Sequence, residues 1–270
     1  MIATQCPLTG NPSGYANTVN DVKVMALERN ISYWVQIAPY SEDGSLPPPY
    51  ELSVPSKFCD IFPLKYFSDS TDSNAVGVRD FAYTHHKENF YYNMTYTLYG
   101  HMMAGGVALG KPPNDSMNAE CSTSSEVVRR VTHVWFYRWD DFSVPDAVHF
   151  SVLDKISTEA SSHMDRNHSI AISCFSGRGR SGTFAAVVAA KHRRARTYSE
   201  VVDLIIEMRR SRDGLVETPA QMKFILRLLD EYYFDEIKMG PFDVQVGILR
   251  AFLAFIVSIA VYVFYVGTCD

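Results

Sequence analysis

Hydrophobic residues recur along the chain with two periods, and each period predicts a different kind of element. Between residues 20 and 38 they fall near helical spacing, which predicts one amphipathic helix. Alternation over residues 128–137, and more loosely over residues 90–95, predicts two strands. The apolar residues 170–172 predict a third strand. Two helix-prone runs follow it, at residues 184–192 and 198–210.

This mixture of elements in a chain of 270 residues predicts one α/β domain with an appendage. We assign residues 1–19 to an N-terminal extension and residues 20–240 to the domain. Residues 110–125 are polar and rich in turn-forming residues, so they predict a loop where further strands would enlarge the sheet. The middle of the domain is therefore expected to be short.

Composition narrows the function classes. Hydrophobic residues make up 47% of the chain and charged residues 20%, as in a globular protein and unlike a disordered one. The net charge of -5 argues against a nucleic-acid partner. The five cysteines are widely spaced and lack metal-type pairs, which predicts reduced thiols in the cytosol and no metal site. Four Asn-x-Ser/Thr sequons leave a secreted or luminal glycoprotein as a distant alternative: Asn30, Asn93, Asn114 and Asn167.

The tail has a different character. Residues 248–267 are apolar apart from Arg250, Ser258 and the tyrosine hydroxyls, and these twenty residues match the length that spans a bilayer. We expect a single C-terminal transmembrane helix that leaves the domain in the cytoplasm, with Arg250 reaching the headgroups. The alternative is a terminal helix or strand of the protein core.

The segment with the most chemistry follows the strand at residues 170–172. Cys174 and Arg180 are separated by a loop that contains Gly177 and Gly179, and a helix-prone run follows. Backbone N–H groups in such a loop, at the positive end of a helix dipole, bind a phosphate-like anion and stabilise a thiolate. The planar guanidinium of Arg180 matches phosphate oxygens.

This segment resembles the active-site loop of the cysteine-dependent protein tyrosine phosphatases. The resemblance covers residues 20–236 and is strongest from Val131 onward. It implies a twisted mixed β-sheet flanked by helices, with Cys174 as the nucleophile and Arg180 on the phosphate. It also implies that Ser181 assists departure of the sulfur. The backbone of the remaining loop residues would hold the phosphate: Phe175, Ser176, Gly177, Arg178 and Gly179. Ser173 departs from the family, which usually has histidine there, and we expect a less activated thiol.

Asp141 lies in a segment, residues 139–145, that resembles the mobile loop carrying the general acid of the family. It precedes Cys174 by thirty-three residues, close to the spacing in the family. Asp140 stands where proline is usual and Ser143 where glycine is common, which loosens the loop. The alternative for Asp141 is a solvated loop carboxylate.

Two further segments extend the resemblance. Residues 208–221 are similar to the second catalytic loop, where Gln221 is implied to position the hydrolytic water and Glu217 replaces a second glutamine. The Glu217 carboxylate would repel a phosphate dianion if it faced the site, or it may point away. Residues 56–61 resemble the phosphotyrosine-recognition segment, with Phe58 stacking on the substrate ring and Asp60 holding the peptide backbone.

The resemblance implies hydrolysis of phosphotyrosine in a protein or peptide, through a cysteinyl-phosphate intermediate and without a cofactor. The competing interpretation is a membrane-anchored pseudophosphatase that binds phosphotyrosine peptides without turnover. Ser173, Asp140 and Glu217 favour this alternative, whereas Cys174, Arg180 and Asp141 favour catalysis.

Overall fold

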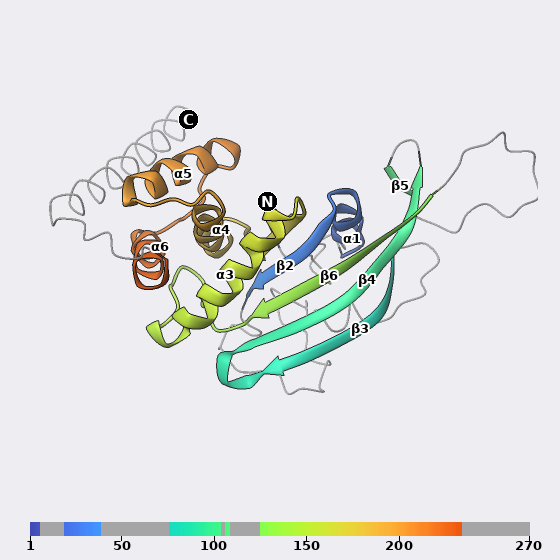
Figure 1. Ribbon diagram of the computed structural model, residues 1–270, viewed down its shortest axis with the longest axis horizontal. Helices are drawn as coiled ribbons and strands as arrows, with labels where there is room; N and C mark the ends of the chain where they lie inside the picture. Colours follow the sequence, from blue (N-terminus) through green and yellow to red (C-terminus); the bar gives the residue numbers. More distant parts are fainter. Residues whose placement is uncertain (6–18, 39–75, 104–105, 109–124, 234–270) are drawn as a thin grey trace, which may run out of the picture.

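A twisted β-sheet forms the centre of the molecule in the computed structural model, which describes residues 1–5, 19–38, 76–103, 106–108 and 125–233 (Figure 1). The described residues form seven strands in the spatial order β1-β7-β2-β6-β4-β3, with β5 paired to β4. Their bounds are β1 Ile2–Gln5, β2 Ile31–Ile37, β3 Gly77–His86, β4 Tyr91–Met103, β5 Gly106–Ala108, β6 Ser125–Phe136 and β7 Ser169–Cys174.

The sheet is mixed, as the sequence predicts. Strands β1, β7, β2 and β6 run parallel to one another, whereas β4 runs antiparallel to β6, β3 and β5. The two strands beside β7 are therefore parallel to it and deliver their carboxyl ends to the same edge as Cys174. At that edge a ligand meets strand ends and helix N-termini.

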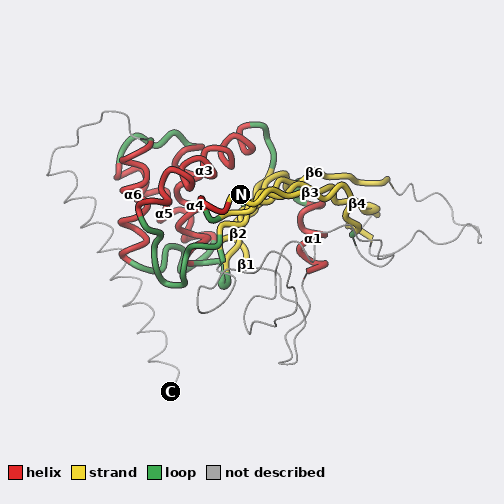
Figure 2. The backbone as a smooth tube through the Cα atoms, turned by 90° about the horizontal axis from the view of Figure 1, so that it is seen from below, coloured by secondary structure: helices red, strands yellow, loops and turns green. Residues whose placement is uncertain are grey.

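Helices cover the parallel part of the sheet on both faces. The described helices are α1 Val19–Glu28, α3 Phe150–Asp165, α4 Gly179–His192, α5 Tyr198–Ser211 and α6 Pro219–Tyr232, with short 3₁₀ turns η1 Lys87–Asn89 and η2 Ala147–His149. Helix α1 lies on the opposite side of the sheet from α3 and α4 (Figure 2).

Alternating residues of the strands supply two separate cores. Tyr33 and Val35 of β2 join the large core under α3, α4 and α6, whereas Trp34 between them packs with α1. Ile170 and Ile172 of β7 share the first core in the same way. The strand that carries Cys174 is thus buried on both faces and held rigidly.

The predicted helix over residues 20–38 is wrong in its second half. Helix α1 ends at Glu28, Asn30 adopts a left-handed conformation (φ 53°), and Ile31–Ile37 form strand β2. The apolar residues of a strand buried on both faces form a nearly continuous run, which continues the helical spacing of α1 by coincidence.

The other predicted elements in the described part of the chain are confirmed. Strands β4, β6 and β7 lie over the predicted segments, although Phe90 and Tyr137 fall just outside them. Helix α5 matches its predicted bounds to one residue, and α4 ends at His192 as predicted but begins earlier, at Gly179. Strand β1 lies within residues 1–19, so the segment we assigned to an extension contributes to the sheet.

Several predictions fall on other parts of the chain. The polar segment 110–125, apart from Ser125 in β6, lies outside the described residues, as does the apolar tail at 248–267. Among the helices that the structure describes, none combines the length and the hydrophobicity needed to cross a membrane.

Candidate active site

Cys174 is the last residue of β7 and its side chain is buried. The chain then turns through residues 175–178 and enters α4 at Gly179. Gly177 has a left-handed conformation (φ 71°), which an L-residue rarely adopts, and Arg178 O accepts a hydrogen bond from Gly182 N at 2.9 Å. The predicted strand, glycine loop and helix are therefore present, and the thiol lies at the N-terminal end of α4.

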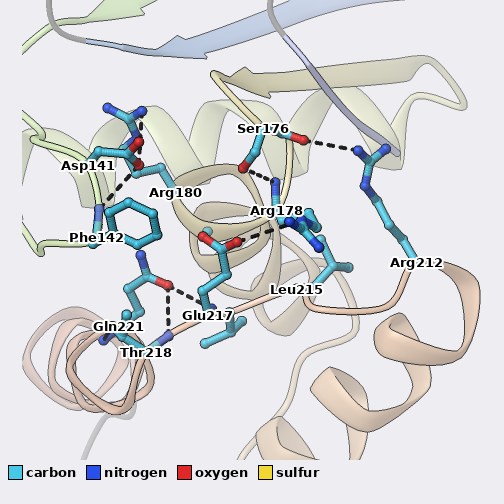
Figure 3. Close-up of polar contacts among 12 residues, drawn as sticks. Asp141, Phe142, Ser176, Arg178, Arg180, Arg212, Leu215, Glu217, Thr218 and Gln221 are labelled. Carbon is cyan, nitrogen blue, oxygen red and sulfur yellow. Dashed lines mark hydrogen bonds and ion pairs between the residues drawn. The ribbon is translucent and has the colours of Figure 1, made fainter. Parts of the chain in front are cut away.

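Arg180 connects this loop to the segment that carries Asp141. Its side chain is only 3% exposed, its Nη1 donates to Trp139 O at 2.9 Å, and its Nη2 lies 3.2 Å from Asp141 Oδ1 (Figure 3). The structure thus brings Asp141 to Arg180, in the loop and helix start that follow Cys174. A guanidinium held by two partners presents its remaining N–H groups in a fixed direction.

The segment that carries Asp141 is fixed by a buried residue, Trp139, and exposes the Asp141 side chain to solvent. Trp139 is fully buried, donates its indole N–H to Ser143 O at 2.9 Å and packs edge-on against Phe224. Asp141 follows with its side chain 46% exposed, and Phe142 has a left-handed φ of 56°. The carboxylate therefore lies at the solvent boundary of the site, within reach of both water and Arg180.

A second loop, between α5 and α6, supports the first. Arg209 donates to Leu215 O at 2.8 Å and to Val216 O at 2.7 Å, and burial lowers the pKa of its guanidinium. Gly182 lies so close to this loop that a Cβ there would be 2.8 Å from Val216 N. Any side chain at residue 182 would push the two loops apart.

Gln221 caps the N-terminus of α6. It forms a capping box with Thr218, and its Oε1 accepts hydrogen bonds from Glu217 N at 2.8 Å and Thr218 N at 3.3 Å. Its Nε2 points elsewhere and has no hydrogen-bond partner in the described part of the chain. This amide lies next to the loop, 3.2 Å from the place a Cβ of Gly179 would occupy.

Glu217 faces the loop rather than solvent. Its Oε1 lies 3.6 Å from Arg178 Nε, and its Oε2 would be 2.3 Å from a Cβ on Gly179 (Figure 3). A side chain at residue 179 would displace this carboxylate. The sequence left the direction of Glu217 open, and the structure places its charge at the N-terminus of α4.

Behind the loop, Ser173 takes part in a buried polar chain on the opposite face of β7. Its Oγ accepts a hydrogen bond from Trp34 Nε1 at 2.8 Å, and Trp34 stacks on His133 with ring centroids 5.2 Å apart. His133 Nδ1 lies 3.2 Å from the hydroxyl of Tyr96, and burial lowers the pKa of His133 to about 3. Ser173 is therefore held by an indole donor, and this indole in turn stacks on a neutral imidazole.

Arg212 is a residue of the site that the motifs did not identify. Its two terminal nitrogens donate to Ala3 O at 3.3 Å and to Ser176 O at 3.1 Å, so it bridges β1 and the loop. Phe142, 68% exposed beside Asp141, was missed as well. The lone signal for Arg212 was its place in the second loop, whereas its partner Ala3 lies 209 positions away in sequence.

The site has the features of an anion-binding centre. Three buried polar atoms around the loop have no hydrogen-bond partner among the described residues: Arg180 Nε, Ser181 Oγ and Gln221 Nε2. Buried donors without partners are costly unless a ligand satisfies them. No group of metal-binding side chains occurs in the ranges the structure describes. Phe58 and Asp60 lie outside the described residues, so their predicted roles stay predictions.

The family model and the relatives that match this sequence all point to one family. The sequence model of the protein-tyrosine phosphatase family matches residues 114–231. Tyrosine-protein phosphatase non-receptor type 2 of Rattus norvegicus is 32% identical over 104 residues, which cover 37% of this chain and 25% of the rat protein. Tyrosine-protein phosphatase 2 of Dictyostelium discoideum is 30% identical over 111 residues, which cover 38% of this chain and 29% of that protein. The chain thus spans only between a quarter and a third of these relatives.

Solved structures agree at the level of the fold. The protein tyrosine phosphatase TbPTP1 of Trypanosoma brucei superposes with a TM-score of 0.55 at 22% identity, over 88% of this chain and 70% of that chain. TcPTP1 of Trypanosoma cruzi gives a TM-score of 0.53 at 19% identity, with the same coverage.

Proposed function

We propose that the chain is a member of the protein-tyrosine phosphatase family and hydrolyses phosphotyrosine in a protein or peptide through a cysteinyl-phosphate intermediate. The observation that carries this proposal is the meeting of Cys174, Arg180 and Asp141 around one anion-binding loop. A nucleophile, an electrostatic clamp and an acid are the three groups that the reaction needs.

In the first step the Cys174 thiolate attacks phosphorus and the bond from phosphorus to the phenol oxygen breaks. Asp141 gives its proton to the leaving phenolate, so tyrosine departs neutral. Arg180 and the N–H groups of the loop stabilise the negative oxygens as charge redistributes. The ion pair between Arg180 and Asp141 keeps the acid beside the clamp before substrate arrives.

In the second step water attacks the phosphorus of the cysteinyl phosphate, and the thiolate leaves. Asp141, now deprotonated, accepts the proton of the water. The Nε2 of Gln221, which lacks a partner in the described residues, is suited to orient this water, and Ser181 Oγ is suited to donate to the departing sulfur. The products are inorganic phosphate and the restored enzyme, and no cofactor enters the cycle.

The test is hydrolysis of a phosphotyrosyl peptide by the full chain, measured as phosphate released. Cys174→Ser should remove activity completely, and Asp141→Asn should lower kcat by about a hundredfold or more. Asp165→Asn is the matched control, because Asp165 is also an exposed carboxylate in a pair with a cationic residue but lies on α3 beside His192. Parent activity no greater than that of Cys174→Ser would reject the proposal.

A pseudophosphatase is the second candidate, and two observations favour it. Glu217 places a negative charge at the anion-binding loop, and Ser173 provides a hydroxyl where the family usually has histidine. Retention of a phosphotyrosyl peptide by the inactive parent, with loss of binding in Arg180→Ala, would identify this function instead.

We further propose that residues 248–267 anchor the protein in a membrane with the phosphatase domain in the cytoplasm. The support is the sequence: the segment is apolar over a length that spans a bilayer, and Arg250 lies near its start. Alkaline extraction of membranes should leave the full chain in the pellet, and Leu253→Arg with Ile259→Arg should release it. Recovery of the unsubstituted chain in the supernatant would reject the anchor.

A further inference from the structure

The Glu217 carboxylate is a fixed negative charge inside an otherwise cationic anion site. We propose that Glu217 is a specificity-determining residue that competes with the substrate phosphate for the N-terminus of α4, so that the site prefers a phosphoryl group of lower charge. This inference rests on the proposed function, because it concerns the same anion-binding loop.

The position of the carboxylate is the first support. Oε1 lies 3.6 Å from Arg178 Nε, and Oε2 lies against the backbone of Gly179, the first residue of α4. The first N–H groups of a helix have no partner within the helix and attract anions. Glu217 thus lies where an incoming phosphate would also be stabilised.

Hydrogen bonds hold the backbone on both sides of Glu217 in place. Glu217 N donates to Gln221 Oε1 at 2.8 Å, and the preceding Val216 has a left-handed φ of 62°. Arg209 holds Val216 O at 2.7 Å on the other side. Since the side chain is only 20% exposed, a phosphate that displaces the carboxylate must move it within a closely packed loop.

The charges that face Glu217 show what a substrate would meet. Arg178 is its direct partner, and Arg180 on α4 is already paired with Asp141. Arg212 binds Ser176 O on the far side of the loop, and Cys174 lies at its base. With a thiolate and two carboxylates near three guanidinium groups, a dianion gains less attraction here than it would without Glu217.

Protonation of the substrate phosphate would weaken this repulsion. Phosphotyrosine changes from a dianion to a monoanion near pH 6. The Glu217 carboxylate repels the monoanion less than the dianion, so the site binds the monoanion with a smaller penalty. A neutral amide of the same shape at residue 217 would remove the effect at every pH.

Sulfate is a suitable probe because it remains a dianion over the whole range, so that only the protein titrates. Its dissociation constant is measured by calorimetry between pH 5 and 8 on the full chain carrying Cys174→Ser, which removes both turnover and the thiol. Added Glu217→Gln should tighten sulfate binding about tenfold at pH 7.5. Glu207→Gln is the matched control, because Glu207 also pairs with an arginine but lies exposed on α5.

Equal or weaker sulfate binding by a folded Glu217→Gln protein would overturn the inference. If thermal unfolding shows that Glu217→Gln is not folded, Glu217→Ala replaces it with the same expected result. Sulfate binding by neither protein also overturns the inference. Because the readout is equilibrium binding without turnover, it is separate from the activity assay that tests the proposed function.

Discussion

Arg180 shows how one buried side chain defines the site. Its guanidinium binds the carbonyl of Trp139 with one nitrogen and Asp141 with another, and it rises from the first turn of α4. Because the group is planar, fixing two nitrogens also fixes the direction of the third. A lysine of similar length has a single nitrogen and cannot hold both partners in this geometry.

Arg180→Lys should therefore weaken anion binding and lower kcat/KM by about thirtyfold or more, since the charge remains but the fork is lost. Calorimetric sulfate binding and peptide hydrolysis measure the two effects. Arg193→Lys is the control, because Arg193 makes an exposed two-bond contact with Glu207 far from the loop. A loss of the same size in both variants would contradict a special role for Arg180.

Gly179 and Glu217 should be energetically coupled. A methyl group at residue 179 would meet Glu217 Oε2, the end of a flexible side chain that has to shift, so Gly179→Ala should destabilise the protein by about 1 kcal/mol at most. In a Glu217→Ala background the same change should cost clearly less, because the colliding atom is gone. Urea unfolding of the four proteins gives the coupling energy. Strictly additive effects would show that the carboxylate does not lie over Gly179.

At the scale of elements, the buried histidine on β6 links stability to pH. His133 is fully buried between Trp34 and Tyr96, and its pKa is lowered from 6.5 to about 3 by burial. The unfolded chain therefore binds a proton below pH 6.5 that the folded protein does not bind until about pH 3.

The free energy of unfolding should consequently fall as the pH drops from 6.5 toward 4. His133 contributes up to about 1.4 kcal/mol of this loss for each pH unit. Urea unfolding at several pH values should show a shallower dependence for His133→Gln, whatever its baseline stability. An unchanged dependence, or an imidazole that titrates near pH 6.5 by NMR, would contradict a neutral buried His133.

The indole of Trp34 ties β2 to the residue before the nucleophile. Trp34→Phe removes the donor to Ser173 Oγ and leaves a small void, so the protein should lose about 1–3 kcal/mol of stability. Alkylation of Cys174 by iodoacetamide as a function of pH would show whether the thiol also changes. Tyr198→Phe, which removes a hydroxyl paired with Asp230 on the exposed side of α5, provides the control. Equal stability losses would show that the Trp34 contact is not special.

At the scale of the whole molecule, the N-terminal strand supports the active-site loop. Gln5 of β1 is in register with Cys174 of β7, and Arg212 joins Ala3 to Ser176. The first five residues thus brace the strand that ends at the nucleophile, although they are the most distant in sequence from the loop between α5 and α6.

Deletion of residues 1–5 should therefore lower the melting temperature and weaken sulfate binding in the Cys174→Ser protein. Arg212→Gln removes the contacts with Ala3 and Ser176 but leaves strand β1 in place. It should weaken sulfate binding in part and lower the melting temperature less than the deletion does. Calorimetry and thermal unfolding separate the two effects. Unchanged sulfate binding after both changes would show that β1 does not support the loop.

The sequence by itself predicted the mixed sheet and most of its later elements. From residue 125 onward strands β6 and β7 and helices α4 and α5 were predicted, because β6 alternates, β7 is a short apolar run, and the two helices lie in helix-prone runs, whereas α3 and α6 were not predicted. It failed at residues 31–37, because a strand buried on both faces has no alternation to distinguish it from a helix.

The sequence also determined the chemistry of the loop, because local order decides what one strand, one glycine turn and one helix can bind. Only the tertiary structure decided which partners surround it. The contacts of Arg180 with Trp139 and Asp141, of Trp34 with Ser173 and of Arg212 with Ala3 join residues 39 to 209 positions apart. The direction of Glu217 was decided there too, since it depends on the capping box of Gln221 and on the bare backbone of Gly179. Such contacts depend on how the sheet brings its strands together, and no local pattern encodes them.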